Sequence, residues 1–215
     1  MFLKNIRLAI YDWNGTLLDD IHTAYGSVCH IFKMVAPDVP PPSLDEYRNE
    51  ITSDFMNFYW AHGMPRTFTG DMFNAIRTPW YEQHSGSIAL NKGARELLSV
   101  CKTLGMKNAI VSASPEDIEP YLDRYNVRDL FDKIRIRAWP KDGAFRETLD
   151  FFGIAPSEAF YLDDTFDGLR IAKKFGLRTI GFTGGYNSRT RMEAAQPDKI
   201  VDSLSEVTRL LQEKV

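Results

Sequence analysis

The sequence predicts an α/β protein in which a parallel β-sheet is covered by helices and a helical segment is inserted after the first strand. From Leu104 onward, short apolar runs alternate with helical segments across short turns, a pattern typical of βαβ units. Between Leu17 and Asn91 clean β runs are missing and the pattern is helical. A chain of 215 residues is long enough for one large domain, or for a core domain with a smaller insert.

Each expected strand of the sheet is a short apolar run bounded by turn residues or by a helical segment. In chain order, the expected strands cover residues 7–11, 108–112, 133–137, 159–162 and 178–182, and we expect the last of these to be the final strand. The helices between them are expected over residues 116–125, 143–152 and 168–175. In an open α/β sheet of this kind, function gathers where the strands end and the loops begin.

The inserted segment has three helical patches, at residues 20–35, 44–62 and 71–84. Prolines between residues 37 and 42 separate the first two patches, and Pro65 and Gly70 separate the second from the third. We therefore expect a core domain made of residues 1–17 and 91–215, and a helical domain made of residues 18–90. The aromatic residues of the insert are interpreted as its own small core, with substrate binding as the alternative.

The composition excludes several classes of protein. Apolar residues make up 44% and charged residues 26% of the chain, which is ordinary for a globular protein and unlike a collagen, a coiled coil or a disordered tail. The net charge of -3 gives no electrostatic reason to expect a nucleic-acid partner. Cys29 and Cys101 cannot form a disulfide framework. No apolar run is long enough for a signal peptide or a membrane span, so we expect a cytoplasmic protein without a membrane partner.

The first strand is followed by a segment whose side chains could take part in catalysis, Asp12-Trp13-Asn14-Gly15-Thr16. A carboxylate directly after an apolar strand can act as an exposed nucleophile. Gly15 allows a sharp turn and a close approach of backbone amides to a ligand, and Thr16 offers a hydroxyl. Taken alone, such a segment is also typical of an ordinary turn.

Residues at three further strand or helix ends could act together with the carboxylate of Asp12. Ser112 and Ala113 follow a strand and can bind an anion, although a serine there can also cap a helix. Lys141 is a cation near a helix start, where many lysines are simply solvated. The pair Asp163-Asp164 follows a buried strand, and adjacent buried carboxylates need a cation. Oxygen ligands without histidine or thiolate favour Mg²⁺, so the four groups together have the parts of a phosphoryl-transfer site.

In order and spacing, these groups resemble the four motifs of the haloacid dehalogenase-like hydrolase superfamily over nearly the whole chain. Residues 12–17 look like the D-x-D-G-T-L signature, and Ser112, Lys141 and Asp163-Asp164 look like the second, third and fourth motifs. Residues 162–176 are similar to the acidic-pair version of β-phosphoglucomutase-like members. The insert sits where the C1 cap of these and of phosphoglycolate phosphatase-like members lies, and residues 91–105 resemble the return to the core.

The resemblance implies a Rossmann-like core, a mobile cap, and Mg²⁺-dependent attack by Asp12 on a small phosphorylated metabolite to form an aspartyl-phosphate. It assigns catalytic roles to Asp12, Asn14 and Lys141. Substrate binding falls to Gly15, Thr16, Ser112, Ala113 and Lys141, with phosphate held in part by the backbone amides of residues 14 and 15. The implied metal ligands are Asp12, the Asn14 carbonyl, Asp163 and Asp164, whereas Asp167 is expected to face a lysine or solvent. The oligomeric state stays open between monomer and homodimer.

One residue departs from the phosphatase pattern. Family phosphatases carry a second aspartate two residues after the nucleophile, which protonates the leaving oxygen and then activates water, and here that position holds Asn14. General acid–base catalysis contributes about 10²–10⁴-fold, so we expect slow hydrolysis of alkyl esters. A catalytically weak protein that binds a phosphorylated ligand or a protein partner is one alternative, and an enzyme that resembles phosphonoacetaldehyde hydrolase is another. The latter needs a cap lysine, and the insert offers only Lys33 and, at its exit, Lys92.

Overall fold

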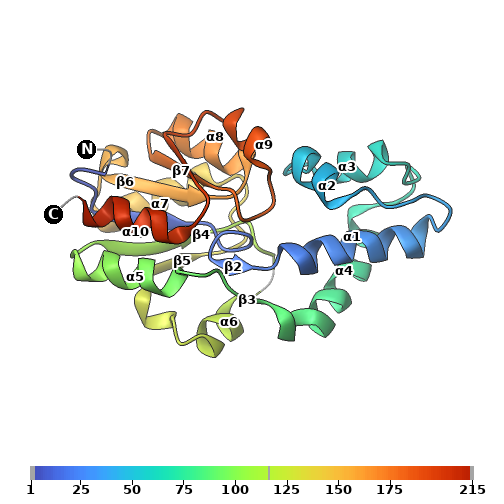
Figure 1. The fold of residues 1–215 in the computed structure, drawn as a ribbon, viewed down its shortest axis with the longest axis horizontal. Helices are drawn as coiled ribbons and strands as arrows, with labels where there is room; N and C mark the ends of the chain where they lie inside the picture. Colours follow the sequence, from blue (N-terminus) through green and yellow to red (C-terminus); the bar gives the residue numbers. More distant parts are fainter. Residues whose placement is uncertain (1–2, 116, 214–215) are drawn as a thin grey trace.

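A six-stranded parallel sheet forms the centre of the computed structural model, which describes residues 3–115 and 117–213 (Figure 1). Its strand order is β5-β4-β1-β6-β7-β8, and every neighbouring pair is parallel. The strands span β1 (Leu8–Tyr11), β4 (Lys107–Val111), β5 (Lys133–Arg135), β6 (Ala159–Asp163), β7 (Arg178–Phe182) and β8 (Lys199–Val201). The sequence-based expectation of a parallel α/β core is confirmed.

Helices cover both faces of this sheet because side chains alternate along each strand. Ala9 and Tyr11 of β1 belong to one buried cluster, and Leu8 and Ile10 belong to another on the opposite face. The first cluster includes side chains from α5 (Ala94–Thr103), α6 (Glu119–Arg124) and α10 (Leu204–Gln212). The second includes side chains from α7 (Asp142–Phe152) and α8 (Phe166–Phe175), while α9 (Arg189–Glu193) packs near β8.

The inserted segment forms a group of helices that lies to one side of the sheet (Figure 1). It contains α1 (Ile21–Val35), α2 (Leu44–Glu50), α3 (Phe55–Ala61) and α4 (Gly70–His84), which share a mainly aromatic and aliphatic cluster of their own. The chain leaves the core through β2 (Leu18–Asp19) and returns through β3 (Ala89–Leu90), and these two short strands pair antiparallel. Short 3-10 turns complete the chain at η1 (Ser85–Ser87), η2 (Arg128–Leu130) and η3 (Pro156–Glu158).

Four details of the sequence-based expectation were wrong. The strand at residues 178–182 is not the final one, because β8 adds three residues at the sheet edge, too few to give a periodic signal. The patch at 44–62 is split into α2 and α3. A region expected to lack strands contains β2 and β3. The helix expected from residue 116 starts at Glu119, and residue 116 itself lies outside the described residues.

No helix within the described residues is long and apolar enough to cross a membrane.

Candidate active site

The predicted site residues converge at the carboxyl ends of three neighbouring strands. Asp12 follows β1, Ser112 follows β4, and Asp163 ends β6 with Asp164 directly after it. The backbone N–H of Asp12 still donates to the Leu162 carbonyl at 2.9 Å, so the sheet ladder fixes the position of this carboxylate. Because β4, β1 and β6 are adjacent and parallel, residues about 150 positions apart in sequence meet at one edge.

Lys141, which precedes α7, joins these carboxylates. Its ammonium donates to Asp12 Oδ1 at 2.9 Å, to Asp163 Oδ2 at 2.9 Å and to the Tyr161 hydroxyl at 2.6 Å. The lysine is only 3% exposed. Burial by itself would lower the pKa of Lys141, but the charges of Asp12 and Asp163 outweigh it and raise the pKa, so the side chain is a permanent cation.

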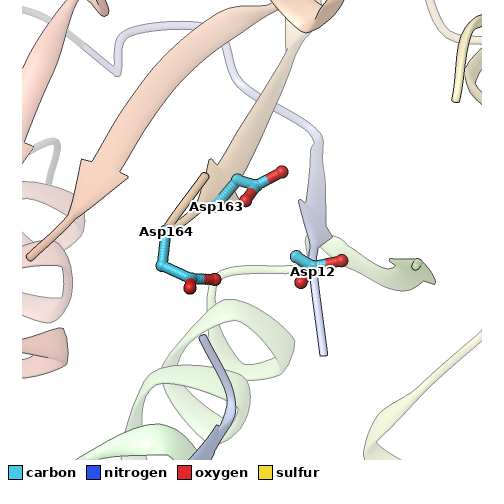
Figure 2. A group of neighbouring side chains, drawn as sticks. All are labelled: Asp12, Asp163 and Asp164. Carbon is cyan, nitrogen blue, oxygen red and sulfur yellow. The ribbon is translucent and has the colours of Figure 1, made fainter. Parts of the chain in front are cut away.

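Three buried carboxylates face this single cation. Oxygens of Asp12, Asp163 and Asp164 lie within 4.8 Å of one another. Figure 2 shows the three side chains as neighbours. Burial raises the pKa of Asp12 to about 6, although the Lys141 charge opposes the rise and the Asp163 charge adds to it. Burial followed by the charge of Asp163 raises the pKa of Asp164 well above its ordinary value. The cluster therefore has an excess of negative charge that a bound cation would relieve.

Neighbouring donors orient the acidic pair. The Thr165 amide and hydroxyl donate to Asp163 Oδ1, and the same threonine hydroxyl caps the start of α8. Thr16 donates to Asp164 Oδ1 at 2.6 Å, and the Tyr186 amide donates to Asp164 Oδ2 at 2.6 Å. Each Asp164 oxygen accepts one of these hydrogen bonds and retains a second lone pair, and an all-oxygen donor set suits a hard divalent cation. The residues present thus fit a Mg²⁺-type ion.

The side chain of Asn14 is held by a second buried carboxylate, Asp20. Asn14 Nδ2 donates to Asp20 Oδ2 at 2.7 Å, and the Tyr186 hydroxyl donates to the same oxygen at 3.0 Å. The Gly15 amide donates to Asp20 Oδ1 at 2.8 Å. Asp20 is 1% exposed, and burial raises its pKa. A carboxylate is therefore present next to residue 14, but it comes from the residue just before α1.

These contacts change two of the predicted roles. The Gly15 amide, expected to hold phosphate, already donates to Asp20, and the Thr16 hydroxyl, expected to bind substrate, already donates to Asp164. Gly15 is nonetheless required, because its φ is +74° and a Cβ there would lie 2.2 Å from Asp164 Oδ2. Gly15 and Thr16 thus contact buried carboxylates and are not part of the chamber lining. Ser112 and Ala113 line the open space next to Asp12.

That open space is a chamber of about 500 Å³ between the sheet edge and the inserted helices. On the core side its walls include Asp12, Asn14, Ser112, Ala113 and Lys141. On the side of the insert they include Tyr47, Phe55, Tyr59, Phe73 and Arg77. Substrate binding by aromatic residues of the insert, the alternative to a purely structural core, is thus compatible with the geometry.

Hydrogen bonds join the insert to the core across this chamber. The Ser53 amide donates to Asp167 Oδ2 at 2.8 Å, Asn187 Nδ2 donates to the Ile51 carbonyl at 3.2 Å, and the Ser188 amide donates to the Arg48 carbonyl at 3.0 Å. We refer to these three contacts as the clasp. Asp167, expected to face a lysine or solvent, is half-buried and accepts a hydrogen bond from a backbone amide of the insert.

Sequence reasoning missed three residues of the site. Asp20 looked like the start of a helix, and Tyr186 and Asn187 lie in a loop without a recognisable motif. The available signal for Asp20 was its position, since an acidic residue six positions after Asn14 can fold back on it across the turn at Gly15. For Tyr186 and Asn187 no such signal exists, because their partners Asp164 and Ile51 are distant in sequence.

Comparisons with known proteins find a family match over most of the chain. A family model described as haloacid dehalogenase-like hydrolase matches residues 9–182. The phosphoglycolate phosphatase of Pseudomonas putida is 22% identical over 211 residues, which cover 92% of this chain and 77% of that protein.

Two solved structures share the fold. A haloacid dehalogenase-like protein of unknown function from Agrobacterium tumefaciens has a TM-score of 0.79 at 18% identity, with 97% of this chain and 98% of that chain covered. The protein CbbY of Rhodobacter sphaeroides, solved in complex with phosphate, has a TM-score of 0.73 at 22% identity, with 94% and 96% covered.

Replacement of Lys141 by methionine should destabilise the protein strongly. The variant leaves the buried carboxylates without their cation, and breaking such a pair costs about 3–5 kcal/mol. We expect this loss in urea denaturation at pH 7.5 and a smaller loss at pH 5, because Asp12, with a pKa of about 6, is then mostly protonated. Lys107→Met, which removes an exposed ion pair with Asp132, is the control and should cost less than about 1 kcal/mol. Equal losses for both variants would contradict the assignment.

Proposed function

The chain belongs to the haloacid dehalogenase-like hydrolase family, and from this premise we propose that it is a phosphatase that hydrolyses small phosphorylated metabolites with Mg²⁺ as its cofactor. The observation that carries the proposal is the meeting of Asp12, Ser112 and Lys141 at one wall of the chamber, with the buried acidic pair Asp163-Asp164 next to Asp12. Relatives named as phosphoglycolate phosphatases, and CbbY solved with phosphate, support the same class of substrate.

The proposed reaction starts at Asp12. Its carboxylate attacks the phosphorus atom, the ester P–O bond breaks, and an aspartyl-phosphate forms while the departing alcohol oxygen takes up a proton. Water then attacks this phosphorus, loses a proton, and releases inorganic phosphate and the free carboxylate. Lys141 offsets the charge of Asp12 beside an anionic substrate, and Ser112 and Ala113 bind phosphate oxygens.

Asp12, Asp164 and the backbone carbonyl of Asn14 would hold Mg²⁺, with Asp163 as a further ligand or as a support. When bound, the ion supplies positive charge that offsets the repulsion between the carboxylates and the phosphate. Of the acidic pair, Asp164 is the better ligand, because Asp163 already receives three hydrogen bonds from Lys141 and Thr165.

We assign residues 18–90 to a cap and residues 1–17 and 91–215 to the core. The separate cluster shared by α1–α4 and the chamber between these helices and the sheet edge support this division. A cap over the site excludes bulk water and so strengthens the interactions of Lys141 and the carboxylates with the phosphate.

The geometry favours a phosphatase over an enzyme that resembles phosphonoacetaldehyde hydrolase. Such chemistry needs a lysine of the cap in the site, whereas Lys33 and Lys92 are both exposed. Among the described residues that line the chamber, the lysine is Lys141, and its ammonium already binds Asp12 and Asp163. The binding-protein alternative rests on Asn14 alone and is tested by the activity of the chain.

Release of phosphate from a generic ester such as p-nitrophenyl phosphate tests the proposal. We expect Mg²⁺-dependent turnover by the native chain and none by Asp12→Asn, because the amide cannot attack phosphorus. Asp167→Asn, on the wall of the same chamber, is a comparison that should retain the nucleophile and therefore measurable turnover. Phosphate release at the same rate by the native chain and by Asp12→Asn would exclude the proposed mechanism.

The stabilisation of the protein by Mg²⁺ should depend on pH. Asp12 and Asp164 have raised pKa values, and protons compete with a metal ion for carboxylates. We expect MgCl₂ to raise the melting temperature clearly at pH 7.5 and much less at pH 5, below the pKa of about 6 for Asp12. Asp164→Asn should weaken this response, whereas the exposed Asp71→Asn should not. A Mg²⁺ response of equal size at both pH values would contradict the site.

The pairing of Asn14 with Asp20 leads to a prediction about catalysis. Asn14→Asp restores a carboxylate at the acid–base position and should raise turnover of an alkyl phosphate, by up to about 10²–10⁴-fold. However, it also places a second carboxylate at the 2.7 Å contact that half-buried Asn14 now makes with the buried carboxylate of Asp20. We therefore expect the single variant to gain less than the exchange variant Asn14→Asp/Asp20→Asn, which keeps the charge and the hydrogen bond. Steady-state rates of both variants decide this, and no gain from either would mean that another group supplies the proton.

A further inference from the structure

The wall that the insert contributes to the chamber is mainly aromatic. The rings of Phe55 and Phe73 lie 4.4 Å apart between centroids, and Tyr59 packs on Phe73 at 5.6 Å. Tyr47 and Ile51 extend the same wall. The phosphate-binding groups are all on the opposite wall, so a substrate whose phosphate meets Asp12 directs its alcohol portion toward these rings. Apolar surface of this kind favours an apolar partner.

The chamber is too large for a very small alcohol portion. The clasp ties Arg48, Ile51 and Ser53 to the core, so the volume of about 500 Å³ belongs to an arrangement in which the insert already contacts the core. Cavities of this size hold drug-sized ligands. A two-carbon group such as the glycolate portion of phosphoglycolate would leave most of the aromatic wall without contact.

The charges in the chamber also argue against an anionic alcohol portion. Its described cations are Lys141, bound to Asp12 and Asp163, and Arg77, whose guanidinium lies 3.9 Å from the centroid of the Tyr81 ring. The carboxylate of Asp167 lines the same chamber and would repel a second negative group.

Building on the proposed phosphatase function, we infer that the substrate is the phosphate monoester of an uncharged alcohol with an apolar, ring-sized body. The phosphate lies at Asp12, Ser112 and Lys141, and the ring packs against Phe55 and Phe73. The inferred substrate differs from phosphoglycolate, which is small and anionic and gives its name to the phosphoglycolate phosphatase relatives.

A panel of three esters tests the inference: 2-phenylethyl phosphate, ethyl phosphate and phosphoglycolate. The first two have unactivated alkoxide leaving groups, so their chemical steps are similar and kcat/KM reports on contacts with the ring. We expect 2-phenylethyl phosphate to exceed ethyl phosphate by about 10- to 100-fold, as burial of an aromatic ring provides, with phosphoglycolate lowest. Phe73→Ala should reduce the ratio of kcat/KM for 2-phenylethyl phosphate to kcat/KM for ethyl phosphate. Phe151→Ala, at an exposed ring outside the chamber, should leave this ratio unchanged.

The outcomes separate this inference from the function on which it rests. Equal kcat/KM for the three esters, or preference for phosphoglycolate, would overturn the apolar-substrate inference and leave the phosphatase function intact. Hydrolysis of none of the esters, with p-nitrophenyl phosphate also resistant, would reject the phosphatase function itself. If Phe73→Ala does not fold, the native panel still decides, and Phe55→Leu provides a second test of the ratio.

Discussion

The ion pairs of Lys141 with Asp12 and Asp163 are the constraint on which the site depends. Strand pairing brings three carboxylates to one sheet edge, where burial makes their negative charges costly. The ammonium of Lys141 lies 2.9 Å from an oxygen of Asp12 and from an oxygen of Asp163, and it offsets part of this negative charge. Burial, together with the remaining negative charge, raises the pKa values of Asp12 and Asp164, and that charge also explains the fit of a divalent cation. Stability and chemistry at this edge are therefore governed by the same balance of charges.

Asn14 and Asp20 form a pair in which an amide lies against a buried carboxylate. Asn14 lies in the loop after β1, and the carboxylate that contacts it comes from the residue that leads into α1. Because the Gly15 amide and the Tyr186 hydroxyl also donate to Asp20, this carboxylate links the loop after β1, the exit to the inserted helices and the loop after β7. The asparagine is thus part of a built hydrogen-bond network and is not an isolated loss of a charged group.

The inserted helices contribute to the site through packing and through the clasp. Their own cluster makes them a stable body, and backbone groups of residues 48–53 reach Asp167, Asn187 and Ser188 of the core. These contacts use backbone amides and carbonyls, so they depend on where the break between α2 and α3 falls. Phe55, the first residue of α3, packs on Phe73, and both rings belong to the aromatic wall of the chamber.

The sequence by itself determined the parallel core, the place of the insert and the four strand-end groups, because apolar periodicity and turn residues are local signals. Asp12, Ser112, Lys141, Asp163 and Asp164 could be selected because each follows or precedes a recognisable element. Tertiary structure alone decided which donors those residues meet: Gly15 and Thr16 face Asp20 and Asp164 instead of the chamber, and Asp167 binds Ser53. The Thr16–Asp164 and Ser53–Asp167 hydrogen bonds join groups more than a hundred residues apart and leave no periodic trace in the chain, so these partners became visible only once the strands and the insert were packed together. Gly15 and Asp20 are five residues apart, and their contact depends on how the turn between them folds back.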